Sequence, residues 1–312
     1  MHFDDRADDY AAARPPYPPA LWQRLRTLGL LRPGATALDL GAGTGQATEP
    51  LLEAGLRVTA VEPGRRLAAK LRSAHPTARL LVERAEDAEF SDAEFDLVVA
   101  ATSIHWMDLD VVVPKIHACL KEDGRFLVWR HVFGDPRGRP TPFRDRVAEI
   151  VRARSATADA RGSAEDLAAT ADRLTASGLF DVEESATFLW DIELNAEQVE
   201  RLFGTFSDWS AREARQAASA ADGLGGVVLE HYSSWLLVLA PGDRRQGRPD
   251  VERWISRSSP PRRERAGCRG SRRASRLGGA RTLSSAERPR ALYLSAAAGS
   301  GRCTPRGRYP SA

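Results

Sequence analysis

Three glycines at alternate positions, Gly41, Gly43 and Gly45, form the part of the sequence best suited to holding a ligand. They follow an apolar run that ends at Leu40, and a stretch with helical character begins at Gln46. Glycines at this spacing allow a sharp backbone turn and let a ligand approach bare amides. Amides at the start of a helix also carry partial positive charge, which suits a carboxylate or a phosphate. The segment therefore predicts a buried strand, a ligand-binding turn and a helix.

Two acidic residues accompany this turn. Asp39 stands two residues before Gly41, and Glu62 ends the next apolar run, about 20 residues beyond the loop. An acid in the position of Glu62 can accept hydrogen bonds from both ribose hydroxyls of an adenosine. The spacing G-x-G-x-G differs from the G-x-G-x-x-G of a pyrophosphate turn. Asp39 would repel a diphosphate but attract the ammonium and sulfonium groups of S-adenosylmethionine (SAM). The residues therefore favour a SAM site over a nicotinamide dinucleotide site.

Residues 38–45 (LDLGAGTG) resemble the SAM-binding motif of class I methyltransferases, and residues 61–63 (VEP) resemble the acidic ribose motif that follows it. More narrowly, the chain from Phe3 to about Ala240 resembles the bacterial type 11 methyltransferases related to the trans-aconitate methyltransferases. This resemblance implies an enzyme with SAM as its cofactor. The residues that it assigns to the cofactor in this part of the chain are Asp39, Gly41, Ala42, Gly43, Gly45, Glu62 and Pro63.

The expected third strand, residues 78–83, leads into Ala85 and Glu86, which resemble the segment that borders the adenine in this family. Glu86 is then the acceptor for the adenine amino group. The preceding pair, Glu83-Arg84, departs from the family, in which glycine is common at this point. The alternative is an exposed acidic loop with no ligand contact.

The loop that begins at Thr102 follows a strongly apolar run, residues 95–101. In open α/β sheets ligands bind beyond the carboxyl ends of the strands, so this loop should face the methyl group, with Thr102 beside the cofactor. His105 could take a proton from an acceptor hydroxyl or amine, and Trp106 could form a wall of the pocket. A carboxylate acceptor needs no base. His131, at the end of the next expected strand, reaches either the ligand or the core.

The N-terminal arm contains Tyr10, Arg14 and Tyr17, the last two within the proline-rich segment RPPYPP. It resembles the arm of the type 11 relatives, which folds over the cofactor pocket as a lid. The resemblance implies that these three side chains contact the acceptor, with Arg14 suited to a bidentate pair with a carboxylate. The alternative is a surface arm packed by its aromatic rings.

Apolar runs of strand length alternate with stretches of helical spacing over residues 1–241, which we interpret as one methyltransferase domain. The expected fold is α/β, a Rossmann-like seven-stranded, mostly parallel sheet with helices on both faces and an antiparallel last strand. Residues 135–178 are interpreted as a helical cap insertion, and His75 as a solvated residue at a helix end. The expected strands are residues 35–40, 56–61, 78–83, 95–101, 124–130, 180–194 and 227–239.

The formal net charge of +3 divides into two unlike parts. Residues 242–312 contain 18 Arg, no Lys and 5 acids, a charge of +13, which leaves −10 for residues 1–241. The segment lacks apolar periodicity, so we interpret it as a disordered or frameshift-derived tail. Three widely spaced cysteines indicate neither a disulfide framework nor a metal site. The lack of a long apolar run argues against a membrane segment, and the expected location is the cytoplasm.

The expected activity is transfer of a methyl group from SAM to a small-molecule acceptor, which is a carboxylate, a hydroxyl or an amine. One alternative is a SAM-fold protein that has lost catalysis and acts as a binding or regulatory subunit. A less favoured alternative is a nucleic-acid methyltransferase recruited by the basic tail. Against it, the loop after residues 95–101 lacks the Asn/Asp-Pro-Pro-Tyr/Phe sequence used on base amino groups. The sequence does not indicate the oligomeric state.

Overall fold

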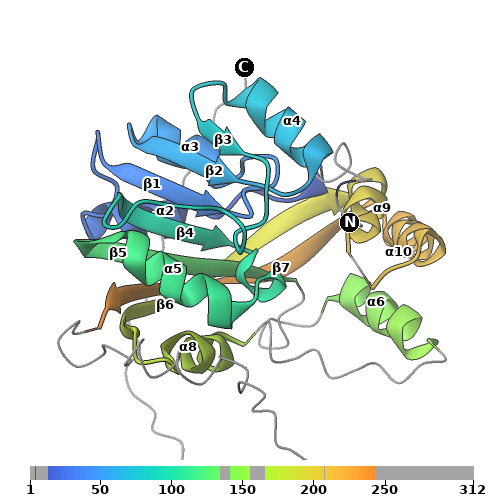
Figure 1. The fold of residues 1–312 in the computed structure, drawn as a ribbon. Helices are drawn as coiled ribbons and strands as arrows, with labels where there is room; N and C mark the ends of the chain where they lie inside the picture. Colours follow the sequence, from blue (N-terminus) through green and yellow to red (C-terminus); the bar gives the residue numbers. More distant parts are fainter. Residues whose placement is uncertain (1–3, 5–12, 134–140, 155–165, 207, 243–312) are drawn as a thin grey trace, which may run out of the picture. The chain divides into compact units, whose positions relative to one another are not determined.

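Seven strands form one sheet in the order β3-β2-β1-β4-β5-β7-β6 (Figure 1). The computed structural model describes residues 4, 13–133, 141–154, 166–206 and 208–242, so the predicted tail lies outside it apart from Gly242. Strands β1 to β5 are joined in parallel, whereas β7 runs antiparallel to both of its neighbours, β5 and β6. The predicted Rossmann-like sheet with an antiparallel last strand is confirmed. The strands are β1 (Thr36–Leu40), β2 (Arg57–Val61), β3 (Arg79–Leu81), β4 (Phe95–Ala101), β5 (Leu120–Phe133), β6 (Phe180–Asn195) and β7 (Val227–Pro241).

Helices cover both faces of the sheet, as predicted (Figure 1). Neighbouring residues of a strand point to opposite faces, so Trp129 packs with Leu21 of α2 and Leu51 of α3, whereas Val128 packs with Ile116 of α5. Within the described ranges, no helix has the length and apolar character needed to cross a membrane. The helices are α2 (Pro19–Thr27), α3 (Thr48–Glu53), α4 (Arg65–Ala74), α5 (Leu109–Cys119), α6 (Pro142–Arg152), α8 (Leu167–Thr175), α9 (Ala196–Gly204) and α10 (Ala211–Gly223).

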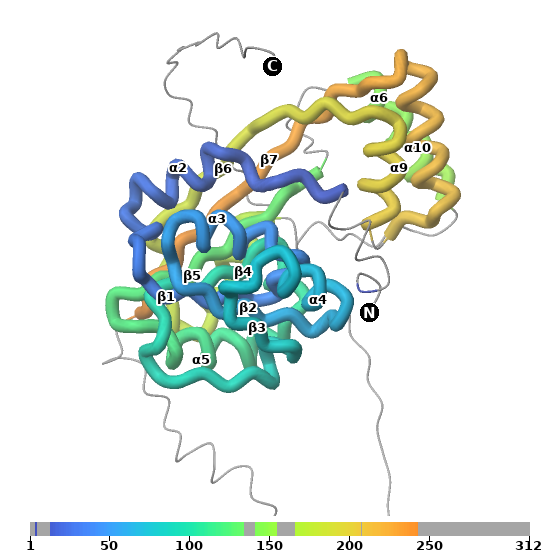
Figure 2. Tube along the Cα trace, turned by 90° about the horizontal axis from the view of Figure 1, so that it is seen from above, coloured from blue at the N-terminus to red at the C-terminus, as the bar shows by residue number. Residues whose placement is uncertain are grey.

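Three helices, α6, α9 and α10, form a cluster with a hydrophobic core of its own, and we call it the helical cluster. Phe143 of α6, Phe203 of α9 and Ala217 of α10 pack together with Tyr232 of β7. Figure 2 shows the long strands β6 and β7 running from the rest of the sheet to these helices. The cluster therefore sits at the end of these two long strands, where Phe133 of β5 also packs against it.

The two helices within the predicted cap insertion, α6 and α8, pack in different places. Helix α6 belongs to the helical cluster, whereas Leu174 of α8 lies in the core beneath the sheet with Phe180. The connecting residues 134–140 and 155–165 lie outside the described residues. The insertion is thus divided between two cores, and its role as a substrate cap stays a prediction.

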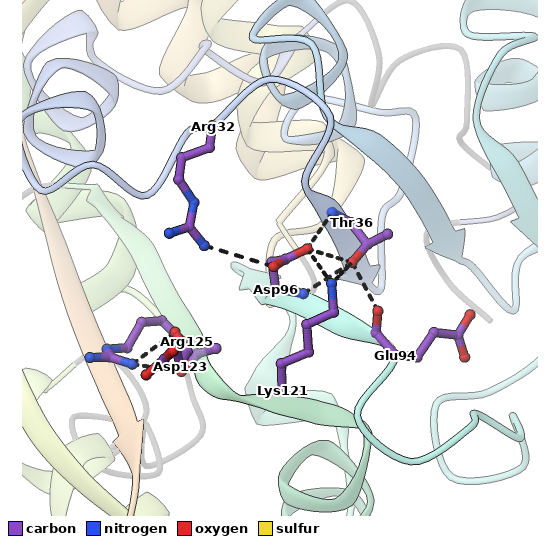
Figure 3. Close-up of polar contacts among 8 residues, drawn as sticks. Arg32, Thr36, Glu94, Asp96, Lys121, Asp123 and Arg125 are labelled. Carbon is purple, nitrogen blue, oxygen red and sulfur yellow. Dashed lines mark hydrogen bonds and ion pairs between the residues drawn. The ribbon is translucent and has the colours of Figure 1, made fainter.

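A polar network holds β1, β4 and β5 together near the edge of the sheet where β1 and β4 begin (Figure 3). Asp96 Oδ2 lies 2.8 Å from both the amide nitrogen and the hydroxyl oxygen of Thr36, and 2.7 Å from Lys121 Nζ. Arg32 approaches the other carboxyl oxygen at 3.7 Å. Although partial burial alone would raise it, the hydrogen bonds from Lys121 and Thr36 lower the pKa of Asp96 to about 2. This edge lies opposite the glycine loop.

Candidate active site

The glycine loop turns sharply at the carboxyl end of β1. Gly41, Gly43 and Gly45 all have positive φ, at +67°, +61° and +105°. The amides of Gly41 and Ala42 donate to the Val61 carbonyl at 2.9 and 3.1 Å, which ties the loop to the end of β2. A Cβ on Gly41 would lie 2.6 Å from Cβ of Ser103, so only glycine fits beside the loop that follows β4. The predicted strand, turn and helix are all present.

The third glycine makes room for a side chain of the protein itself. A Cβ on Gly45 would lie 2.6 Å from Cδ2 and 2.7 Å from Nε2 of His75, the residue that ends α4. His75 is half-buried and covers the backbone of Gly45. The predicted position at a helix end is confirmed, but the residue is not fully solvated, because the imidazole packs against the glycine loop. No local sequence pattern signals this contact.

Two buried carboxyl groups, Asp39 and Glu62, stand beside the loop, and we call them the carboxyl pair. Glu62 is 5% exposed, and its two oxygens accept hydrogen bonds from the amides of Gly43 at 2.8 Å and Gly64 at 2.7 Å. Burial raises the pKa of Glu62, and the two amides lower it again in part. The charge of Glu62 reaches Asp39, so the pair shares one electrostatic environment.

Asp39 is fully buried within β1. The Thr48 hydroxyl donates to its Oδ2 at 2.7 Å, whereas Oδ1 has no hydrogen-bond partner. Burial, opposed by the Thr48 hydrogen bond and reinforced by the charge of Glu62, raises the pKa of Asp39 to about 7. The carboxyl pair therefore offers one unsatisfied oxygen beside the glycine loop, in a place where a cationic group would be stabilised.

The segment Ala85-Glu86 is fixed to α5 and to its own neighbour. The amide of Asp108 donates to Glu86 Oε1 at 2.9 Å, and Arg84 forms an ion pair with the same oxygen at 3.0 Å. Lys115 Nζ donates to the Glu86 carbonyl at 2.6 Å. Ala85 is buried, and Pro63 after Glu62 is half-buried. The carboxylate of Glu86 thus has protein partners, and its predicted contact with an adenine stays a prediction.

The loop after β4 begins with a strained residue. Thr102 has φ +58°, which a β-branched side chain adopts only under strong local constraint. Its amide donates to the Trp129 carbonyl at 2.8 Å, and its hydroxyl lies 3.1 Å from the hydroxyl of Tyr17. The ring of Tyr17 lies 4.5 Å, centroid to centroid, from His131. Thr102, Tyr17 and His131, predicted from three distant segments, are therefore brought together.

His105 lies in the same loop, with its ring 4.8 Å from Trp106, which is 59% exposed. Burial first, and then the charges of Arg130, Arg14 and Arg173, lower the pKa of His105 to about 3. The imidazole is therefore neutral near pH 7 and only a weak base. Its predicted role in proton transfer stays a prediction that this pKa disfavours.

Arg14 connects the N-terminal arm to the helical cluster. Its Nη2 donates to the Thr205 carbonyl at 3.2 Å, and its guanidinium carbon lies 4.9 Å from the centroid of the Phe206 ring. Burial, followed by the charge of Arg14, lowers the pKa of His131 to about 3. The guanidinium thus lies near two of the predicted acceptor residues, His105 and His131. Tyr10 lies outside the described residues.

Strands β6 and β7 supply neighbours of His131 that the sequence does not predict. Ser234 Oγ lies 2.7 Å from His131 Nδ1 and accepts a hydrogen bond from Trp190 Nε1 at 2.8 Å. Trp190 stacks on Tyr232 with 4.7 Å between ring centroids. The pair Ser233-Ser234, directly before the apolar run 235–241, is the available sequence signal, and both side chains are fully buried.

Residues 38–128 match the model of the methyltransferase domain family named Methyltransf_11. This chain contains a methyltransferase domain. The matched residues span the glycine loop, Glu62, Glu86 and the loop after β4, so the class I methyltransferase resemblance is confirmed. The narrower likeness to the trans-aconitate methyltransferases stays a prediction.

Curated relatives are also named as methyltransferases, and their names assign no methyl acceptor. An uncharacterised methyltransferase of Mycobacterium tuberculosis is 34% identical over 160 residues, which are 47% of this chain and 63% of the relative. An uncharacterised methyltransferase-like protein of Schizosaccharomyces pombe is 28% identical over 145 residues, which are 46% of this chain and 55% of the relative. The chain therefore matches less than two thirds of the length of these relatives.

Solved structures are similar to this chain at lower sequence identity. A protein of Anaeromyxobacter dehalogenans, provisionally named a type II methyltransferase, is 24% identical with a TM-score of 0.47, covering 73% of this chain and 97% of its own. Geranyl diphosphate C-methyltransferase of Streptomyces coelicolor is 15% identical with a TM-score of 0.39, covering 70% and 80%. These values are too low to relate their substrates to this chain.

Proposed function

We propose that the protein transfers a methyl group from SAM to a small-molecule acceptor. The match to the methyltransferase domain family supports this activity. The observation that supports SAM as the cofactor is the carboxyl pair beside the glycine loop. One buried carboxyl oxygen of Asp39 has no hydrogen-bond partner. An ammonium group would supply both a hydrogen bond and a positive charge to it. The residues present therefore fit SAM.

In this proposal each group of residues has one part in holding the cofactor. Glu62 accepts hydrogen bonds from the ribose hydroxyls, and Asp39 stabilises the ammonium group. Gly41, Ala42, Gly43 and Gly45 form the turn that receives the amino-acid end of SAM. Pro63, Ala85 and Glu86 border the nucleoside, and Thr102 closes the opposite side. When bound, SAM supplies an electrophilic methyl group on a sulfonium. The chain contributes mainly the alignment of the acceptor in a site that excludes water.

The acceptor that suits these side chains best is a carboxylate. His105 with a pKa of about 3 is a poor base for deprotonating a hydroxyl or an ammonium group near pH 7. The charges of Arg14, Arg130 and Arg173 all reach His105, and they favour an acceptor that is already an anion. We propose that the acceptor site is lined by Tyr10, Arg14, Tyr17, His105, Trp106 and His131. We also propose that the protein acts in the cytoplasm.

The first experiment is calorimetric titration of SAM and of S-adenosylhomocysteine into the wild type and Glu62→Ala. Binding that the substitution weakens would support the cofactor assignment. Incubation with methyl-labelled SAM and a panel of carboxylic acids, phenols and amines then tests the acceptor class. Label transfer to acids supports the proposal, whereas transfer only to phenols or amines overturns the choice of a carboxylate. Binding without transfer to any compound points to a binding or regulatory protein instead.

A further inference from the structure

The carboxyl pair contains two acids but has no cation among its contacts in the described part of the chain. Glu62 is held by the two backbone amides of Gly43 and Gly64. Asp39 is held only by the Thr48 hydroxyl, with Oδ1 unpartnered and the side chain fully buried. An isolated carboxylate is costly to bury, and a neighbouring carboxylate adds to the cost.

The two acids differ in how well their ionised forms are stabilised. Two amide donors favour the ionised form of Glu62, whereas Asp39 has a single hydroxyl donor and no solvent contact. Of the two groups, Asp39 is therefore the one that retains a proton while no cation is nearby.

We propose that cofactor binding to this protein is coupled to proton release: Asp39 carries a proton in the free protein and loses it to the solvent when the ammonium group of SAM binds. This inference rests on the proposed function. No covalent bond other than the Asp39 O–H bond breaks, and the positive charge of the ligand replaces the positive charge of the departing proton.

The charged groups around Asp39 support this assignment. Burial raises the pKa of Asp39 to about 7. The hydrogen bond from Thr48 of α3 opposes this shift, and the charge of Glu62 at the end of β2 adds to it. Asp4, whose carboxylate accepts from the amides of Arg66 and Leu67 at the start of α4, adds a further negative charge near Glu62. The surrounding charges thus favour the protonated form of Asp39 up to neutral pH.

The test is calorimetric titration of SAM into the full-length protein at pH 6 and pH 8, each in two buffers with different ionisation enthalpies. We expect about one proton released per SAM at pH 6 and far less at pH 8, with affinity rising up to about tenfold per pH unit below neutrality. Asp39→Asn removes the titrating group, and it should abolish the release. Asp92→Asn, which changes an exposed acid, should leave the release unchanged.

A second variant tests the same coupling with the carboxyl group in place. Thr48→Val removes the hydrogen bond that lowers the pKa of Asp39, so proton release should persist to higher pH. Binding of SAM by the wild type with no proton exchange would overturn the inference and leave the proposed function standing. A folded wild-type protein that binds no SAM at any pH would overturn both.

Discussion

The amide of Gly43 donates a hydrogen bond to the carboxylate of Glu62, with 2.8 Å between nitrogen and Oε2. The bond joins the turn after β1 to the end of β2, and the amide of Gly64 holds the other oxygen at 2.7 Å. The carboxylate is thus held in one orientation by the backbone on either side of it. An acid fixed in this way is ready to accept hydrogen bonds without first giving up rotational freedom.

Glu62→Gln tests this arrangement. A glutamine keeps the shape but loses the charge and one acceptor, so one backbone amide is left without its partner. Hydrogen bonds to charged groups contribute about 1.5–3 kcal/mol, so we expect SAM affinity to fall about tenfold to a hundredfold. Calorimetry gives the affinity, with the exposed Glu53→Gln as the control. An unchanged affinity in Glu62→Gln would remove Glu62 from the site.

Gly45→Ala tests the contact with His75. The new Cβ would lie 2.6 Å from the imidazole, and the backbone at φ +105° disfavours any side chain. Gly29 offers a matched control, because it has φ +68° but no atom within 4 Å of its Cβ position. We expect Gly45→Ala to lose about 1–3 kcal/mol more of unfolding free energy than Gly29→Ala.

Removal of the imidazole separates the cost of the collision with His75 from the cost of backbone strain at Gly45. In a His75→Ala background the collision disappears and the backbone strain remains, so the substitution at Gly45 should cost less there. Urea denaturation of the four proteins in this double-mutant cycle gives the coupling. Equal costs in both backgrounds would show that His75 does not pack on the loop.

Asp96→Asn tests the network at the opposite edge of the sheet. The pKa of Asp96 is lowered to about 2 from an ordinary value of 3.8, so its stabilisation is complete above pH 4 and is lost as the pH falls toward 2. We expect the variant to be less stable than the wild type by about 2 kcal/mol more at pH 5 than at pH 2. Denaturant titrations at the two pH values measure this difference, and a constant difference would contradict the assignment.

Arg144→Met tests the attachment of α6 to β7. Arg144 Nη2 lies 2.7 Å from Glu230 Oε2, and the Glu230 side chain is 1% exposed. The substitution leaves a buried carboxylate without its cation, so we expect a loss of about 3–5 kcal/mol. Arg146 on the same helix forms a pair with Glu149 in which both side chains are more than half exposed, and Arg146→Met should cost less than about 1 kcal/mol.

A second substitution shows whether the charge itself is responsible. The double variant Arg144→Met, Glu230→Gln removes both charges and should recover part of the lost stability, which thermal unfolding measures. If the double variant is as unstable as Arg144→Met alone, the loss of stability comes from the contact of Arg144 with Phe133. The guanidinium carbon lies 4.3 Å from the centroid of that ring.

The elements of this fold were predictable where local spacing determines them. The glycine turn, the parallel strands and the last antiparallel pair follow from runs that need no knowledge of distant contacts. Helix α10 was missed although its signals are present: Ser210 and Glu213 form a capping box, and buried alanines recur at helical spacing. Alanine contributes little to a hydrophobic pattern, so the periodicity is weak.

The features of the site that local spacing does not predict depend on contacts between distant segments. His75 reaches Gly45 from the end of another helix, and Ser234 reaches His131 across a strand pair. The lowered pKa of His105 depends first on burial of the imidazole and then on arginines from the arm, from β5 and from α8. Such effects depend on tertiary packing, which residue spacing along one segment does not contain. The residue types at the site were therefore predictable, but their charge states were not.

The helical cluster has a hydrophobic core whose members all follow residue 128, where the family match ends. A substitution inside this core can reshape α6, α9 or α10 without moving a residue that packs against the glycine loop. Selection can therefore act on the two halves of the chain at different rates. A change in the shape of these helices therefore leaves the hydrogen bonds of Glu62 with Gly43 and Gly64 as they are.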